Sequence, residues 1–202
     1  YADDCVIFCK TPRAAERVKE SITNFIEKKL HLKVNREKTV ACSVRDIKFL
    51  GHSFYVASGG VWRLRIHAKS LAKFKAKLKL LTSRSNGMGY ERRKEVLHNA
   101  IRGWVNYFKY AYARTHLQAM DEWLRCRIRM CIWKSWKLPR TRVRNLIKCG
   151  IPQWRAYQWG NASKGYWAVA HSGIMQVAAS NRNLARAGYP SLLGYYEKYH
   201  RM

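Results

Sequence analysis

The chain has 202 residues, 48% hydrophobic and 13% aromatic, so it is long and apolar enough to form a packed core and is not intrinsically disordered. It carries 40 Lys and Arg against 12 Asp and Glu, a formal net charge of +28. Self-repulsion at this charge opposes folding and is usually explained by a polyanionic partner, so we expect nucleic acid rather than an anionic membrane surface.

The positive charge is concentrated in two stretches without acidic residues, 47–90 and 123–196. Both also contain aromatic side chains, on which bases and sugars stack. No apolar run approaches the length of a membrane span, and no segment resembles a signal peptide. The six cysteines lack C-x-x-C spacing, which disfavours a zinc site or a disulfide framework. We therefore expect reduced thiols in a cytoplasmic protein.

The N-terminal third is predicted to be mixed α/β. Residues 5–8 form a short apolar run typical of a buried strand, and a Thr-Pro pair at 11–12 predicts the start of a helix. Residues 32–34 predict a second short strand. Residues 47–66 alternate in polarity and predict a β-hairpin that turns at 58–60.

From about residue 67 the pattern becomes helical. The spacing predicts a helix over 68–81, a second over roughly 91–112 and a third that a capping box at 115–118 opens. Gly103 lies inside the second helix at a cost of about 1 kcal/mol relative to Ala, which implies close packing or a nearby backbone there. A short helix is expected over 141–148, followed by small, aromatic and basic segments.

The first four residues, Tyr-Ala-Asp-Asp, place two adjacent carboxylates in a very basic chain. Adjacent carboxylates repel one another unless a cation lies beside them, and hard oxygen ligands of this kind suit Mg²⁺. Mg²⁺ in a nucleic-acid-binding chain suggests phosphoryl transfer. For the tetrapeptide alone, an ordinary Asp-rich turn is an equally good interpretation.

The motifs, taken in order, resemble those of one protein family. YADD resembles the hairpin motif of reverse transcriptases, and LHLKVNREKT and KFLGHSF resemble the two motifs that follow it. RRKEVLHNAIRGWVNYFKYA is similar to the maturase-specific region of group II intron-encoded members. The segments NLIKCGIPQWRAYQWGNASKGYWAVAHS and GYPSLLGYYEKYH resemble the C-terminal end of bacterial members. The segments after Arg92 disfavour another bacterial type, such as a retron enzyme.

The resemblance is to the C-terminal portion of such a protein, and it implies an α+β fold in three parts. Residues 1–66 correspond to the end of the polymerase palm, with β-hairpins and a helix. Residues 67–137 correspond to a helical thumb and maturase-specific domain, and residues 138–202 to a basic, aromatic extension. A third carboxylate and the fingers would precede Tyr1, so we expect this chain not to polymerise by itself. No Cys/His cluster follows the thumb, so we expect no HNH endonuclease.

The implied function is that of an RNA-directed DNA polymerase of a group II intron, combined with a maturase role in binding intron RNA. A non-catalytic maturase that only stabilises the intron fold is the alternative. The resemblance implies Mg²⁺ as the cofactor, and intron RNA, template RNA, a DNA primer and deoxynucleoside triphosphates as partners, with no membrane. It indicates no particular oligomeric state.

The resemblance assigns catalytic roles to the N-terminal part. It makes Asp3 the metal-ligating carboxylate and Asp4 its supporting neighbour, with Tyr1 and Ala2 beside the incoming nucleotide and primer end. Lys38 matches a lysine near the leaving pyrophosphate and is a candidate proton donor. A solvated turn lysine is the equal alternative for Lys38.

Two further groups of residues are candidates for binding. Phe49, Leu50 and Gly51 match the turn that grips the primer, although Phe49 and Leu50 could equally be hairpin core contacts. The candidate RNA-binding side chains recur at a spacing of four on predicted helices, where a solvated face is the alternative. They are Lys69, Lys73, Lys77, Arg102, Asn106, Arg125 and Arg129. The neighbouring side chains Trp104, Val105, Tyr107 and Phe108 are expected to be core.

Overall fold

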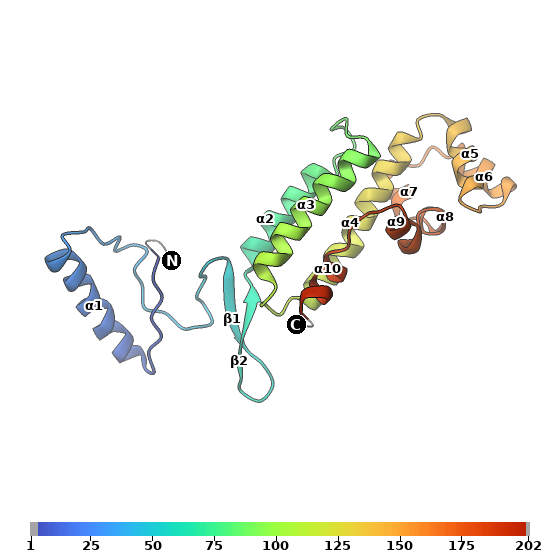
Figure 1. Cartoon of the computed structure of the whole chain (residues 1–202). Coiled ribbons are helices and arrows are strands. Elements are labelled where there is room, and N and C mark those ends of the chain that lie inside the picture. Colours follow the sequence, from blue (N-terminus) through green and yellow to red (C-terminus); the bar gives the residue numbers. More distant parts are fainter. Residues whose placement is uncertain (1–3, 201–202) are drawn as a thin grey trace. The chain divides into compact units, whose positions relative to one another are not determined.

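The computed structural model describes residues 4–200, and the chain divides into two compact units that meet between Ser70 and Leu71. The described residues form helices and one two-stranded antiparallel sheet (Figure 1). The expected α+β class is therefore confirmed. The division into three parts, with boundaries at 66 and 137, stays a prediction.

The first unit contains helix α1 (Pro12–Lys29), which starts where the Thr-Pro pair predicts it. The Thr11 side chain accepts a hydrogen bond from the backbone N–H of Ala14 at 3.2 Å, the usual N-cap arrangement. No residue of α1 is buried, and the Phe25 side chain is 55% exposed. Val18, Ile22 and Ile26 are partly buried, so the unit covers the apolar face of this helix only in part.

The strands expected at 5–8 and 32–34 are wrong, because both segments are irregular in the structure. A strand needs a neighbour for its backbone hydrogen bonds, and within the described residues neither segment pairs with another strand. The first segment instead contacts β1 through side chains, with the Phe8 and Phe54 rings edge to face at 5.6 Å.

The predicted hairpin is confirmed. Strands β1 (His52–Val56) and β2 (Trp62–Ile66) pair antiparallel, with His52 opposite Ile66 and Val56 opposite Trp62. The turn between them contains Gly59 and Gly60 at φ of 84° and 76°, a left-handed conformation that glycine adopts without steric cost.

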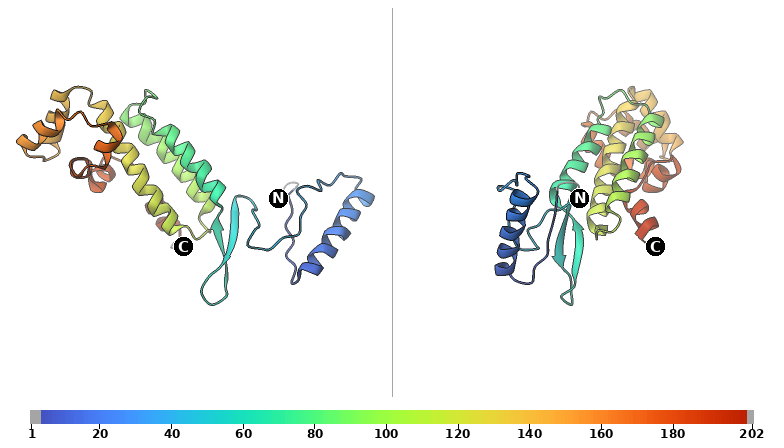
Figure 2. Two further views of the ribbon diagram at one scale, coloured as in Figure 1. Left: turned by 180° about the vertical axis from the view of Figure 1, so that it is seen from behind. Right: turned by 60° about the vertical axis from the view of Figure 1, so that its left-hand side comes forward.

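The second unit is built on α2 (Ala68–Leu81), α3 (Tyr90–Phe108) and α4 (Arg114–Ser135), where α2 begins at the end of the first unit. These helices run alternately up and down beside one another (Figures 1 and 2). The Phe74 ring of α2 stacks on the Trp104 ring of α3 at 4.3 Å. Their buried apolar side chains include Leu78, Leu97, Ile101, Val105, Phe108, Leu117, Leu124 and Ile128. Tyr107, which was expected in the core, is 54% exposed.

The capping box expected at 115–118 is wrong. Helix α4 begins at Arg114 with Ala113 as its N-cap residue, so Thr115 lies inside the helix. The segment between α3 and α4 is instead held by packing and by a hydrogen bond. Ala111 and Ala113 are both buried, and Tyr196 Oη donates a hydrogen bond to the Ala111 carbonyl at 2.9 Å.

The close packing expected at Gly103 is also wrong, because no atom lies within 4 Å of the position that its Cβ would occupy. Gly160 is the helical glycine that packs closely. A Cβ there would lie 2.5 Å from Val143 Cγ2 and 3.4 Å from the Pro139 carbonyl oxygen. The absence of a side chain at Gly160 therefore allows α5 (Pro139–Lys148) and α6 (Gln153–Gly160) to pack together.

The C-terminal segments are more helical than expected. After α6 come α7 (Tyr166–His171), α8 (Gly173–Ala178), α9 (Asn181–Arg186) and α10 (Leu192–His200). Helix α7 packs on α4, and α10 packs on α3 and α4 (Figure 1). None of the helices in residues 4–200 combines the length and hydropathy of a membrane span.

Candidate nucleic-acid interface

Most of the catalytic residues expected at the N-terminus are not among the residues that the structure describes. Tyr1, Ala2 and Asp3 lie outside the described residues, whereas Asp4 is described and exposed. Within residues 4–200, no three His, Cys, Asp or Glu side chains lie close enough together to hold a metal ion.

Lys38 lies in an exposed turn of the first unit. Its backbone N–H donates to the Asn35 carbonyl oxygen and to Asn35 Oδ1, both at 3.2 Å. Asn favours such turns because its side chain bonds the backbone a few residues further on. The turn fixes the backbone of Lys38 and leaves its side chain accessible.

The segment matched to the primer grip forms a tight two-residue turn. Phe49 and His52 exchange backbone hydrogen bonds of 3.1 and 2.8 Å, and Leu50 and Gly51 between them have φ of 48° and 76°. The left-handed conformation costs a residue such as Leu50 roughly 1–2 kcal/mol. His52 Nδ1 lies 3.0 Å from the Leu50 carbonyl oxygen and supports the turn.

The carbonyl of Gly51 ties this turn to the start of α2. It accepts hydrogen bonds from the backbone N–H of His67 and from Ser70 Oγ, both at 3.0 Å. His67 Nδ1 in turn accepts from the backbone N–H of Lys69 at 3.1 Å, which caps the first turn of α2. Burial, and then the positive charges of Lys48, Lys69 and Arg65, lower the pKa of His67. Both effects favour the neutral ring that this cap needs.

The lysines expected on α2 are placed as the spacing predicts. Lys69, Lys73 and Lys77 are exposed along one face of the helix, and no ion pair in the described part of the chain engages them. On α3, Arg102 and Asn106 are likewise exposed and one turn apart. All five side chains are accessible to a ligand.

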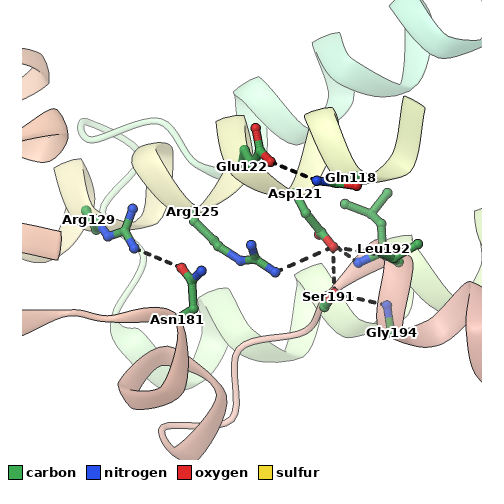
Figure 3. A network of polar contacts seen from close by, with 10 residues as sticks. Gln118, Asp121, Glu122, Arg125, Arg129, Asn181, Ser191, Leu192 and Gly194 are labelled. Carbon is green, nitrogen blue, oxygen red and sulfur yellow. Dashed lines mark hydrogen bonds and ion pairs between the residues drawn. The ribbon is translucent and has the colours of Figure 1, made fainter. Parts of the chain in front are cut away.

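Arg125 and Arg129, which both lie on α4, have partners within the protein (Figure 3). Arg129 is only 6% exposed, and its guanidinium donates to the Ala179 carbonyl and to Asn181 Oδ1, both at 2.9 Å. Arg125 Nη2 lies 3.8 Å from Asp121 Oδ2, and its side chain is partly buried. Arg129 thus links α4 to the start of α9, and we assign it a structural role in place of RNA contact.

The acidic side chains of residues 71–202 are few and are all engaged internally. This part of the chain contains 26 Lys and Arg against five acidic residues. Glu91, Glu95 and Glu197 form ion pairs with Lys94, Arg92 and Arg114. Glu122 accepts a hydrogen bond from Gln118, and Asp121 is buried. The surplus of positive charge is therefore on the surface, where a polyanion can reach it.

Sequence reasoning missed two further basic surfaces. On α5, Arg140, Arg144 and Lys148 recur at a spacing of four and line a cavity of about 400 Å³ together with Tyr157 and Asn161. On α2, Lys75 and Lys79 line a second cavity with side chains from α4 and α7. The spacing of four is visible in the sequence of both helices. The packing of α6 beside α5, and of α7 beside α2 and α4, completes the two cavities and is not visible in the sequence.

Two protein-family models match this chain. Residues 71–150 match the group II intron, maturase-specific domain, and residues 1–54 match the reverse transcriptase (RNA-dependent DNA polymerase) domain. The chain belongs to the group II intron reverse transcriptases and maturases. No curated protein matches it. The maturase-specific match covers α2 to α5 of this reverse transcriptase and maturase, and thus most of the exposed basic side chains described above.

Proposed function

We propose that this group II intron reverse transcriptase and maturase binds RNA through accessible basic side chains on α2, α3, α4 and α5. The observation that carries the proposal is the charge of residues 71–202, with 26 Lys and Arg against five acidic residues that all have internal partners. Intron RNA and the template are the partners that the two family matches support.

The proposed contacts are to phosphates rather than to base edges. The major groove of an RNA helix is too deep and narrow for side chains to read, so proteins recognise folded RNA largely by backbone and shape. Lys69, Lys73 and Lys77 present ammonium groups at successive turns of one helix, a spacing of about 6 Å that suits neighbouring phosphates. Arg102, Asn106 and partly buried Arg125 complete the proposed surface on α3 and α4.

The second part of the proposal concerns RNA-directed DNA synthesis from a DNA primer and deoxynucleoside triphosphates. Asp3 and Asp4 would contribute carboxylate oxygens to Mg²⁺. The turn at 49–51 would hold the primer end, with Tyr1 and Ala2 beside it. The left-handed backbone of Leu50 supports this role for the turn. Strained backbone conformations persist only where the surrounding structure holds them, and they cluster at functional sites. Lys38 would donate a proton to the leaving pyrophosphate.

RNA binding is tested by fluorescence anisotropy of a labelled RNA hairpin over a series of salt concentrations. We expect tight binding at low salt and a linear fall of log K with log salt, because each phosphate contact releases counterions. Weak binding at low salt, or affinity that does not depend on salt, would contradict the proposal. We expect the complex to form in the bacterial cytoplasm.

Polymerisation is tested by primer extension on an RNA template with Mg²⁺, in a protein that includes the sequence upstream of Tyr1. We expect Asp3→Asn to abolish extension and to leave RNA affinity unchanged. Asp46→Asn is the matched control, because Asp46 is an exposed acid of the first unit outside the proposed site. Extension by Asp3→Asn at the wild-type rate would contradict the catalytic assignment.

A further inference from the structure

A cavity of about 400 Å³ lies between α2, α4 and α7 in the second unit. Two tryptophans line it, Trp123 from α4 and Trp167 from α7, and Lys75, Lys79 and Arg127 are also in its wall. Its volume is within the range of small-molecule sites. No acidic side chain is among its lining residues.

Two of the three cations in the wall of this cavity lie close to an aromatic ring. Lys75 Nζ lies 5.1 Å from the centre of the Trp123 ring, and the Arg127 guanidinium carbon lies 5.8 Å from it. Arg127 is fixed in place at the end of α2, since Nε donates to Thr82 Oγ1 at 3.2 Å and Nη2 to the carbonyls of Lys79 and Thr82 at 3.0 Å. The guanidinium of Arg127 is therefore held in a fixed position, whereas the side chains of Lys75 and Lys79 can change conformation around a ligand.

Trp167 is available to a ligand and is itself supported. Its side chain is 42% exposed, and the His171 ring contacts it edge to face at 4.4 Å. His171 Nδ1 lies 2.9 Å from the Trp167 carbonyl oxygen, which orients the imidazole. The buried neighbours Val169 and Ala170 anchor α7 in the core.

We propose that this cavity binds one unpaired nucleotide of the RNA, with its base against the tryptophan rings and its phosphates on Lys75 and Lys79. The inference rests on the proposed RNA binding and adds a site for a single-stranded residue. Aromatic rings accept any base by stacking, and nearby cations hold the flanking phosphates. A paired base within a duplex has no exposed face to insert, so the occupant is a loop, bulge or end. The absence of acids disfavours a basic peptide.

The test measures the affinity of the full chain for two labelled probes, a short oligouridylate and a blunt-ended, fully paired RNA duplex. We expect Trp167→Ala to weaken oligouridylate binding by roughly 5- to 100-fold, and to leave binding of the paired duplex unchanged. Trp167→Phe keeps an aromatic ring and should recover most of the affinity. Trp154→Ala is the matched control, because Trp154 is 69% exposed on α6 and lies outside this cavity.

The salt dependence separates stacking from charge. Lys75→Gln removes one proposed phosphate contact and should reduce the slope of log K against log salt by about 0.7 for the single strand. Trp167→Ala should reduce affinity at an unchanged slope. Equal losses of oligouridylate affinity in Trp167→Ala and Trp154→Ala, or an unaltered affinity in Trp167→Ala, would contradict the proposed nucleotide site without contradicting RNA binding by the protein. If wild type bound neither probe, the proposed RNA binding itself would fail, and the site with it.

Discussion

Asp121 Oδ1 on α4 accepts a hydrogen bond of 2.8 Å from the backbone N–H of Leu192 at the start of α10 (Figure 3). Its other oxygen accepts from Ser191 Oγ at 2.5 Å and from the Leu193 N–H at 3.0 Å. A carboxylate is favourable at a helix N-terminus, where backbone N–H groups lack partners within the helix. Asp121 therefore attaches the last helix of the chain to the three-helix core.

Replacing Asp121 should destabilise the second unit. Asp121→Ala leaves the buried N–H groups of Leu192 and Leu193 unpaired, and we expect a loss of about 2–3 kcal/mol in the free energy of unfolding. Denaturant unfolding followed by circular dichroism measures this. Glu122→Ala is the control, because Glu122 is exposed on the same helix and should lose less than about 0.5 kcal/mol. Similar losses for both would contradict the role given to Asp121.

Gly103 and Gly160, which both lie in helices, should respond in opposite directions to alanine. Gly103→Ala fills open space in α3, and we expect it to raise stability by about 0.5–1 kcal/mol. Gly160→Ala places a methyl group 2.5 Å from Val143 Cγ2, a stiff side chain, and overpacking of this kind costs about 1–3 kcal/mol. Thermal unfolding of the two variants is the measurement, and a change of the same sign in both would refute this account of α5 and α6.

Sequence patterns predicted the long elements because their signals are local. The Thr11 cap, the hairpin turn and the apolar spacing of α2 are each visible within a few residues. Helices α6 to α10 were missed because each has only six to nine residues, and such helices depend on packing rather than on propensity.

The candidate site was predictable to the extent that it is a helix surface. Lys73 and Lys77 are exposed where the spacing placed them. Arg129 was not predictable, because only the fold brings the Ala179 carbonyl and Asn181 to its guanidinium. The cavity beside Trp123 was missed for the same reason, since it needs Trp167 on a helix that the pattern did not predict.

Stability of the first unit should depend on pH through His67 and His52. Burial is the largest cause that lowers the pKa of each ring below its ordinary value of 6.5. The unfolded chain then binds protons at a higher pH than the folded chain, so the free energy of unfolding falls as the pH drops through 6.5. Melting temperatures between pH 5 and 7.5 measure this. His67→Asn keeps a capping side chain that does not titrate, so the melting temperature of this variant should depend less on pH. An unchanged pH dependence in this variant would exclude His67 as a cause of it.

The cysteines should differ widely in reactivity. Burial raises the pKa of the Cys131 thiol, against the opposing effect of Arg93 and Arg127, and the thiol donates to the Thr82 carbonyl at 3.2 Å. Cys5 and Cys42 are exposed. Iodoacetamide at pH 8 followed by peptide mass spectrometry should therefore label Cys5 and Cys42 well before Cys131. Labelling of all three at one rate would contradict the packing of α4 against the end of α2.

RNA binding by the α2 surface is tested most directly by its salt dependence after removal of two lysines from α2. Lys73→Gln with Lys77→Gln removes two proposed phosphate contacts, whereas Lys29→Gln with Lys33→Gln makes the same change of charge at exposed positions of the first unit. For a labelled RNA hairpin, we expect the first pair to weaken binding and to reduce the slope of log K against log salt by about 1–2, and the second pair to leave the slope unchanged. Equal slopes for both double variants would contradict RNA binding by the α2 surface.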